Sequence, residues 1–161
     1  VKAPVAVELM LANNPDLRQT GEVIQSMAAE AGFDVKLRST EFVTALQAAD
    51  KGEYEVFLIG WSGRADADGN VYTFVHTGPP NLNNSGYSSA QVDQWLDQAR
   101  AVQAIPERRA LYTKVAQQLL VDLPRMYLYT PNNIFAMSTK VRGFVPVPDG
   151  LVRLTGMSIP P

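Results

Sequence analysis

The chain has 161 residues, of which 46% are hydrophobic and 19% are charged, and its formal net charge is -2 at pH 7. This length supports one domain with a sizeable core, and the small net charge gives no electrostatic reason to expect nucleic acid or an anionic membrane as a partner. The chain has no cysteine and a single histidine, His76. These counts exclude disulfides, thiolate catalysis and a His-rich metal site, and they argue against a Ser-His-Asp triad. No segment reaches the roughly 18 unbroken apolar residues of a membrane helix.

The chain begins with a strand pattern followed by a helix pattern. Residues 5–11, VAVELML, predict a strand, and the turn residues NNPD follow it. Asn14 is placed to cap a helix that has Pro15 at its first position. Apolar residues at helical spacing then continue for about four turns, which predicts a helix as the second element.

Two further strands are expected, with a helix between them. Residues 33–39, FDVKLRS, alternate between apolar and polar side chains, which is typical of a half-exposed strand near a sheet edge. Thr40 is expected to cap the next helix, which ends near Gly52. Residues 56–59, VFLI, form a short continuous apolar run, and such a run predicts a strand buried on both faces.

This β-α-β-α-β order predicts an α/β fold with a parallel core and right-handed crossovers. The contrast between the two patterns places residues 56–61 at the centre of a three-stranded sheet and residues 33–38 at its outside. In open parallel sheets, ligands bind beyond the carboxyl ends of the strands. The segment that follows residues 56–59 is therefore a candidate binding loop.

The remainder of the chain is expected to be mainly helical and to end in a hairpin. Apolar periodicity predicts a short helix over residues 70–77, another that begins near Gln91, and a third from Pro106 to just before Pro124. Residues 125–138, RMYLYTPNNIFAMS, look like two strands around a Thr-Pro-Asn-Asn turn. They should form a separate hairpin or extend the sheet.

The candidate loop lies within FLIGWSGRADADGN, residues 57–70, where a buried-looking run is followed by an aromatic residue and charges of both signs. Trp61 offers a flat apolar wall or simply closes the core. Arg64 could clamp a ligand carboxylate or form an ordinary surface ion pair. Asp66 and Asp68 both precede a predicted helix, so one should cap it. Asp68 is our choice for the cap, because this leaves Asp66 available for a ligand.

Five segments, taken in order, resemble one family. They are AAEAGFDVKLRS, YEVFLIGWSGRADADGN, NSGYSSAQVDQWLDQAR, PERRALYTKVAQQLLVDLPRMYLY and STKVRGF. In this order and spacing they resemble the C-terminal lobe of bacterial extracellular solute-binding proteins of family 5, the dipeptide- and oligopeptide-binding class that serves ABC importers. Members are longer and have two lobes. We therefore expect residues 1–161 to be a single domain, roughly the last third of such a protein, with the signal peptide lying outside it.

The resemblance implies a periplasmic or cell-surface protein that binds a solute and does not transform it. In this family the loop after the Gly-Trp strand faces the cleft between the lobes, and an aspartate of that loop pairs with the ligand's α-amino group. Asp66 aligns with that aspartate, while Ala67 stands where the family usually has proline. The expected ligand-binding residues are Trp61, Ser62, Arg64, Asp66 and Asn70.

The expected partners are a small peptide-like or amino-acid-like solute, the N-terminal lobe of the same protein and the membrane permease of the importer. We expect no cofactor, no metal and no nucleic acid. A phosphate-binding enzyme would need a glycine-rich turn after the first strand, and LANNPDL has none. The alternative that remains open is a non-catalytic α/β interaction module without a small-molecule ligand.

Overall fold

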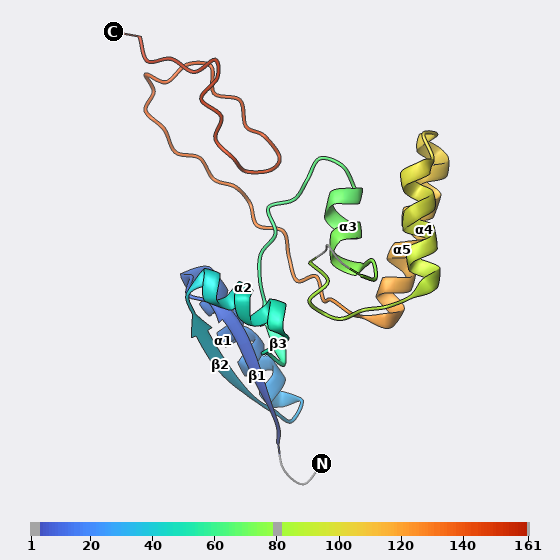
Figure 1. The fold of residues 1–161 in the computed structure, drawn as a ribbon. Helices are drawn as coiled ribbons and strands as arrows, with labels where there is room; N and C mark the ends of the chain where they lie inside the picture. The colour runs from blue at the N-terminus through green and yellow to red at the C-terminus, as the bar shows by residue number, and fades with distance from the viewer. Residues whose placement is uncertain (1–3, 79–81, 161) are drawn as a thin grey trace. The chain divides into compact units, whose positions relative to one another are not determined.

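The computed structural model describes residues 4–78 and 82–160 (Figure 1). The chain divides into two compact units, one that ends at Trp61 and one that begins at Ser62. None of the helices in the described ranges combines the length and the apolar character needed to cross a membrane.

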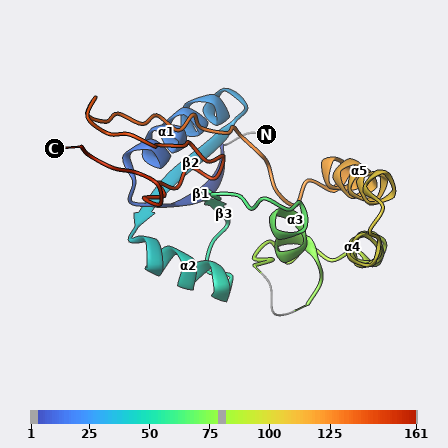
Figure 2. The same cartoon turned by 90° about the horizontal axis from the view of Figure 1, so that it is seen from above.

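The first unit is a parallel sheet with a helix on each face. Its elements are β1 (Val5–Ala12), α1 (Pro15–Glu30), β2 (Phe33–Thr40), α2 (Phe42–Lys51) and β3 (Val56–Leu58). Both strand pairings are parallel, so the predicted β-α-β-α-β core is confirmed. Met10 packs with α2, whereas the adjacent Leu11 meets Gly21 of α1. Successive side chains of a strand point to opposite faces, so the two helices cover opposite faces of the sheet (Figure 2).

The order of the strands is β2-β1-β3, which makes β1 the central strand. The predicted outer position of residues 33–38 is confirmed, but the prediction that residues 56–61 are central is wrong. In β1, all four residues from Leu9 to Ala12 are buried, whereas Val56 of β3 is 46% exposed. The strand β3 also ends at Leu58, before the apolar run does. A continuous apolar run was therefore not evidence that the strand is buried on both faces.

Local signals set the helix ends of this unit, with one correction. The Asn14 side chain accepts hydrogen bonds from the amides of Asp16 and Leu17, as expected of the cap of α1. The prediction that Thr40 caps α2 is wrong, because Thr40 is the last residue of β2. Glu41 is the cap, and its carboxylate accepts from the amide of Thr44.

A glycine allows α1 to approach the sheet closely. Gly21 is the buried residue of α1, and a Cβ at this position would lie 2.8 Å from Cδ2 of Leu11 and 3.4 Å from Cδ2 of Leu37. Any side chain here would have to displace these two leucines. The helix is thereby held at a short distance from β1 and β2.

The second unit is built around three helices, α3 (Asp68–Val75), α4 (Ala90–Ala101) and α5 (Ile105–Asp122). Their core consists of Val75, Val92, Leu96 and Val115. Pro106 lies in the first turn of α5, as predicted. Proline has no amide hydrogen, and at this position no hydrogen bond within the helix is lost, because amides of the first turn have no acceptor in the helix. Trp95 and Tyr112 pack against the core cluster, in agreement with their predicted place on the apolar faces of these helices.

After α5 the described chain forms neither a helix nor a paired strand, apart from one antiparallel bridge between Arg142 and Ser158. The predicted hairpin over residues 125–138 is therefore wrong. The described residues of this segment do not pair with each other or with the sheet. At the bridge, a Cβ on Gly143 would lie 2.1 Å from the carbonyl oxygen of Gly156, so only glycine fits.

The central position of β1 predicts that two methionines contribute differently to the free energy of unfolding. Replacing Met10, which is fully buried, with alanine should lower the free energy of unfolding by about 2–5 kcal/mol, because it leaves a cavity between the sheet and α2. The matched control is Met27→Ala on α1, where the side chain is 67% exposed and the loss should stay below about 1 kcal/mol. Urea denaturation measures both values, and equal losses would contradict the packing described here.

Candidate functional site

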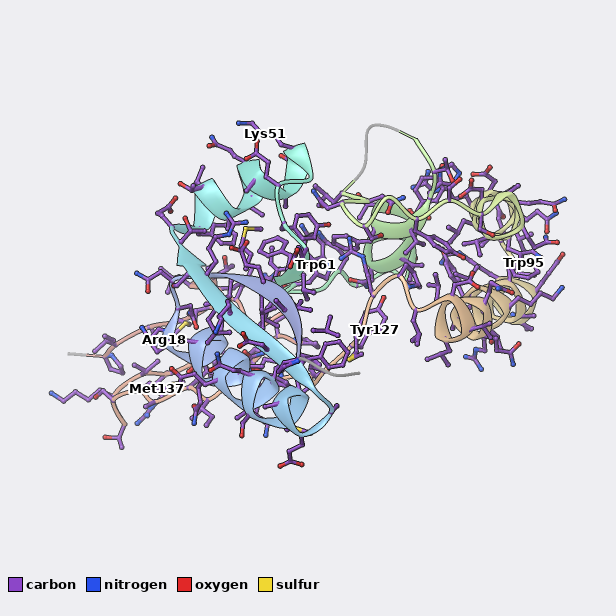
Figure 3. The ribbon with its side chains drawn as sticks, turned by 90° about the horizontal axis from the view of Figure 1, so that it is seen from below. Arg18, Lys51, Trp61, Trp95, Tyr127 and Met137 are labelled. Atoms are coloured by element: carbon purple, nitrogen blue, oxygen red, sulfur yellow. The ribbon has the colours of Figure 1, made fainter. Side chains whose placement is uncertain are left out.

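The candidate loop links β3 to α3 and crosses the boundary between the two units. Trp61 is the last residue of the first unit, and Ser62 is the first of the second. Trp61, labelled in Figure 3, follows the carboxyl end of β3 by three residues and is 43% exposed. Its indole therefore has apolar surface that a ligand could cover. The other four predicted site residues belong to the second unit.

Asn70 organises the turn between Ser62 and α3. Its side-chain oxygen accepts from the amide of Arg64 at 2.7 Å, and its side-chain nitrogen donates to the carbonyl oxygens of Arg64 at 2.7 Å and Asp66 at 3.0 Å. The turn needs a left-handed residue at Gly63, where φ is 82°. Asn70 thus brings Arg64 and Asp66 together by holding their backbone. These contacts give Asn70 a structural role in the loop.

The Arg64 side chain lies along the loop. Its Nη1 donates to the carbonyl of Gly63 at 2.8 Å and reaches the Ser62 hydroxyl at 3.5 Å. A Cβ on Gly69 would lie 3.0 Å from Cγ of Arg64, so the glycine leaves space for the arginine stem. Ser62 and Arg64 are both exposed. A positively charged group and a hydroxyl are therefore presented at the same side of the turn.

Asp66 is held by an arginine of α5. The Arg108 guanidinium donates two hydrogen bonds to the carboxylate, at 2.6 and 2.8 Å, and the Asp68 amide donates a third at 2.9 Å. The hydrogen bonds from Arg108 and from the Asp68 amide hold the pKa of Asp66 at about 2, below its usual value of 3.8. The Asp66 side chain nevertheless remains 57% exposed, so the carboxylate is both ordered and accessible.

Asp68 has a matching partner on α4. Arg100 donates to both of its carboxylate oxygens at 2.8 Å and lies over the ring of Tyr72. The Tyr112 hydroxyl lies 3.5 Å from Asp68 and 3.3 Å from Arg108, and so it joins the two pairs. The first turn of α3 is therefore fixed to α4 and α5 by two aspartates and two arginines.

The assignment of Asp68 as the cap of α3 is wrong. Asp68 is the first residue of the helix, and Ala67, in the cap position, makes no side-chain hydrogen bond. It is Asp66 that accepts from a backbone amide of the first turn. The sequence analysis divided two roles between Asp68, as the helix cap, and Asp66, as the ligand residue. In the structure Asp66 helps to start the helix and also presents an exposed carboxylate.

Sequence reasoning missed Arg100 and Arg108. They lie 32 and 42 residues beyond their aspartates, on two helices, with Arg100 exposed and Arg108 half-buried. Two acidic residues at the start of a helix gave a weak signal, because such carboxylates are often paired with cations as well as with the helix dipole. Nothing in the local pattern identified which cations these would be.

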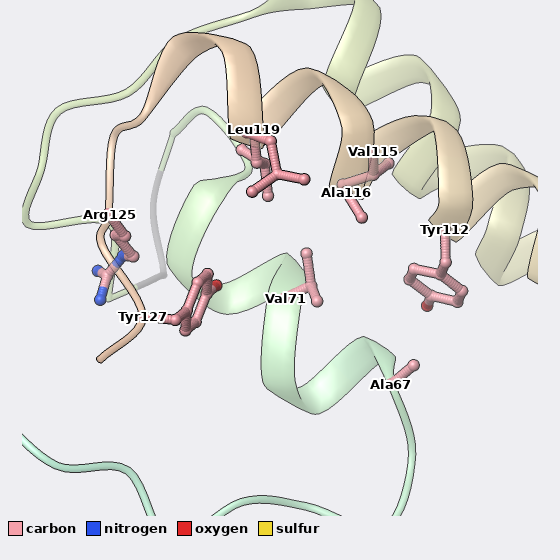
Figure 4. Close-up of a pocket in the computed structure, with 9 residues that line it drawn as sticks. Ala67, Val71, Tyr112, Val115, Ala116, Leu119, Arg125 and Tyr127 are labelled. Carbon is pink, nitrogen blue, oxygen red and sulfur yellow. The ribbon is translucent and has the colours of Figure 1, made fainter. Parts of the chain in front are cut away.

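An apolar pocket of about 380 Å³ adjoins this network (Figure 4). Val71 of α3 faces Ala116 of α5 across it, while Tyr112 lies at one end and Tyr127 and Arg125 lie at the other. Because Tyr112 also contacts Asp68 and Arg108, the pocket and the charged network share a wall. An apolar group could be accommodated next to an exposed carboxylate.

The residues present fit a binding site better than a reaction centre. Arg64 and Asp66 offer opposite charges two residues apart on an ordered turn, which suits a ligand that carries both charges. In the described ranges no three His, Asp or Glu side chains are grouped as they would be around a metal ion. The fold that carries this candidate site is a mixed α/β arrangement with a parallel sheet.

Comparison with known proteins shows similarity to one family. Residues 4–81 match the model described as bacterial extracellular solute-binding proteins, family 5 middle. The peptide transport periplasmic protein SapA of Haemophilus influenzae is 28% identical over 142 residues, which are 85% of this chain and 25% of SapA. The dipeptide-binding protein of Escherichia coli K12 is 27% identical over 150 residues, which are 91% of this chain and 28% of that protein.

Solved structures show the same fold. DppA from Helicobacter pylori, in complex with the peptide STSA, has a TM-score of 0.68 and 29% identity over 75% of this chain and 24% of its own. AppA from Bacillus subtilis, in complex with a nonapeptide, has a TM-score of 0.87 and 20% identity over 97% of this chain and 32% of its own. The chain is therefore similar to the bacterial extracellular solute-binding proteins of family 5. It spans about a quarter of the length of the curated relatives named above.

The pairing of Asp66 with Arg108 predicts a measurable acid response. Because the folded-state pKa of about 2 lies below the ordinary value of 3.8, the pair stabilises the fold above about pH 4 and loses this contribution as the pH falls towards 2. Carbon-detected NMR titration of the Asp66 carboxyl should give the low pKa directly. In an Arg108→Gln variant the pKa should rise towards 3.8. An unchanged value in that variant would mean that Arg108 is not the cause.

Proposed function

We propose that this chain forms one side of the ligand cleft of an ABC importer's solute-binding component, and that the solute is peptide-like. The observation that carries the proposal is the relationship to proteins named for peptide binding, together with an exposed, ordered aspartate in the loop that follows the Gly-Trp strand. On this proposal the rest of the protein supplies the opposite lobe and a membrane permease receives the solute. The periplasmic name of SapA supports a location outside the cytoplasm.

Each predicted site residue has a role in the proposed complex. The Asp66 carboxylate receives the ligand's ammonium group, which shares the carboxylate with Arg108. The Arg64 guanidinium, with Ser62 beside it, receives a carboxylate of the ligand. Trp61 covers an apolar part of the ligand. Asn70 acts by holding the turn. None of these roles involves making or breaking a covalent bond, so the proposed protein is a binder and not an enzyme.

The test uses the complete protein that contains this chain and a pair of matched variants. Asp66→Ala should weaken binding of a free dipeptide by about 30-fold or more, since loss of one partner of a desolvated charge pair costs about 2–5 kcal/mol. Asp68→Ala removes an equivalent bidentate partner of an arginine, but one that faces Arg100 and is less exposed. It should lower the melting temperature with little effect on affinity. Calorimetry and thermal unfolding separate the two roles.

A chemical change in the ligand makes the test specific for the ammonium group. N-acetylation of the dipeptide should weaken binding to the wild type by about as much as Asp66→Ala does, and it should have little further effect on that variant. Additive losses would show that Asp66 and the amino group do not meet. If Asp66→Ala binds normally and only melts early, Asp66 is purely structural. If no peptide binds the wild type, the peptide specificity is wrong.

A further inference from the structure

The apolar pocket between α3 and α5 receives no part of the ligand in the proposed complex. Its volume is about 380 Å³ (Figure 4). Val71, Ala116 and Leu119 supply aliphatic walls, and the rings of Tyr112 and Tyr127 lie at its two ends. An apolar cavity of about 150 Å³ is enough to hold benzene. The pocket is therefore large enough for one aromatic side chain.

One end of the pocket adjoins the carboxylate of Asp66. Ala67 lines the pocket and is the next residue of the chain, so its Cα lies about 3.8 Å from that of Asp66. Tyr112 forms a second link, because its ring lines the pocket while its hydroxyl lies 3.3 Å from Nη2 of Arg108, which binds Asp66. The Asp66 side chain is 57% exposed. This end of the pocket therefore suits a small ligand that carries an ammonium group and an apolar group close together.

The charged side chain at the opposite end of the pocket has partners within its own unit. Arg125 donates to the carbonyl of Leu82 at 2.9 Å, and its guanidinium lies over the ring of Phe74, 4.7 Å from the centroid. The other lining residues in the described part of the chain are aliphatic side chains and two tyrosines, so the pocket suits an apolar group. The tyrosine rings favour an aromatic group, which packs edge to face or offset against them.

We propose that this pocket takes the side chain of the ligand's first residue, and that the protein prefers peptides that begin with an aromatic residue. This preference rests on the proposed function, in which Asp66 receives the ammonium group. In a peptide the ammonium group and the first side chain are bonded to the same carbon atom, whereas the second side chain lies beyond the peptide bond. The first side chain is therefore the one that reaches a pocket beginning at Ala67 while the ammonium group stays on Asp66.

Calorimetry of the complete protein with three free dipeptides, Phe-Ala, Ala-Phe and Ala-Ala, tests this preference. Phe-Ala should bind about 10-fold more tightly than Ala-Ala, or better, because its phenyl ring leaves water for the pocket. Ala-Phe should gain less than Phe-Ala does. Equal affinities of Phe-Ala and Ala-Ala, or tighter binding of Ala-Phe than of Phe-Ala, would overturn the proposal and leave the proposed function standing. If none of the three binds, the proposed peptide specificity fails and the preference fails with it.

A pair of variants of α5 locates the preference at the pocket. Ala116→Phe places a ring in the pocket and should remove most of the difference in affinity between Phe-Ala and Ala-Ala. The matched control is Ala110→Phe, the same change at an exposed position of α5 outside the described pocket lining, and it should leave the difference intact. An unchanged ratio of the two affinities in Ala116→Phe would overturn the proposal. Should that variant not fold, Ala116→Leu fills less of the pocket and should reduce the same ratio in part.

Discussion

Two aspartates fix the beginning of α3, because each is bound by an arginine from another helix. Asp66 binds Arg108 of α5 and Asp68 binds Arg100 of α4, in both cases through two hydrogen bonds. A bidentate pair fixes direction as well as distance, because the planar guanidinium must lie in line with the carboxylate. Carboxylates at this end of a helix are also favoured by its dipole. The loop before α3 is thereby tied to the helical core of its unit.

This arrangement holds Asp66 without a constraint from the neighbouring residue. A proline at position 67 would restrict the backbone of Asp66, and Ala67 imposes no such restriction. The carboxylate is instead fixed at its oxygen atoms, by Arg108 and by the amide of Asp68. On the proposed function, an arriving ammonium group would meet a carboxylate that is already ordered and already shares its charge. The cost of ordering the side chain falls on folding and not on binding, which is what preorganisation means.

Features that depend on neighbouring residues were predicted from the sequence. The strand order and the ion pairs of the loop were not, because residues far apart in the chain determine them. Asn14 and Pro15 predict the start of α1, and the parallel β-α-β-α-β core follows from such local patterns. The central strand was misplaced because residues 56–59 are more uniformly apolar than β1, although burial is set by what packs on each face. The candidate loop was recognised from its position and charges. Its arginine partners were not, because they lie far along the chain on two other helices.

The missing hairpin shows the limit of a local pattern. Residues 125–138 carry aromatic and branched side chains that favour extended backbone. Pairing is a separate requirement, since a strand needs a second edge at the correct register, and the two halves of this segment do not supply one for each other. A strand-like composition therefore does not by itself predict a strand, because the partner edge is decided by residues far along the chain.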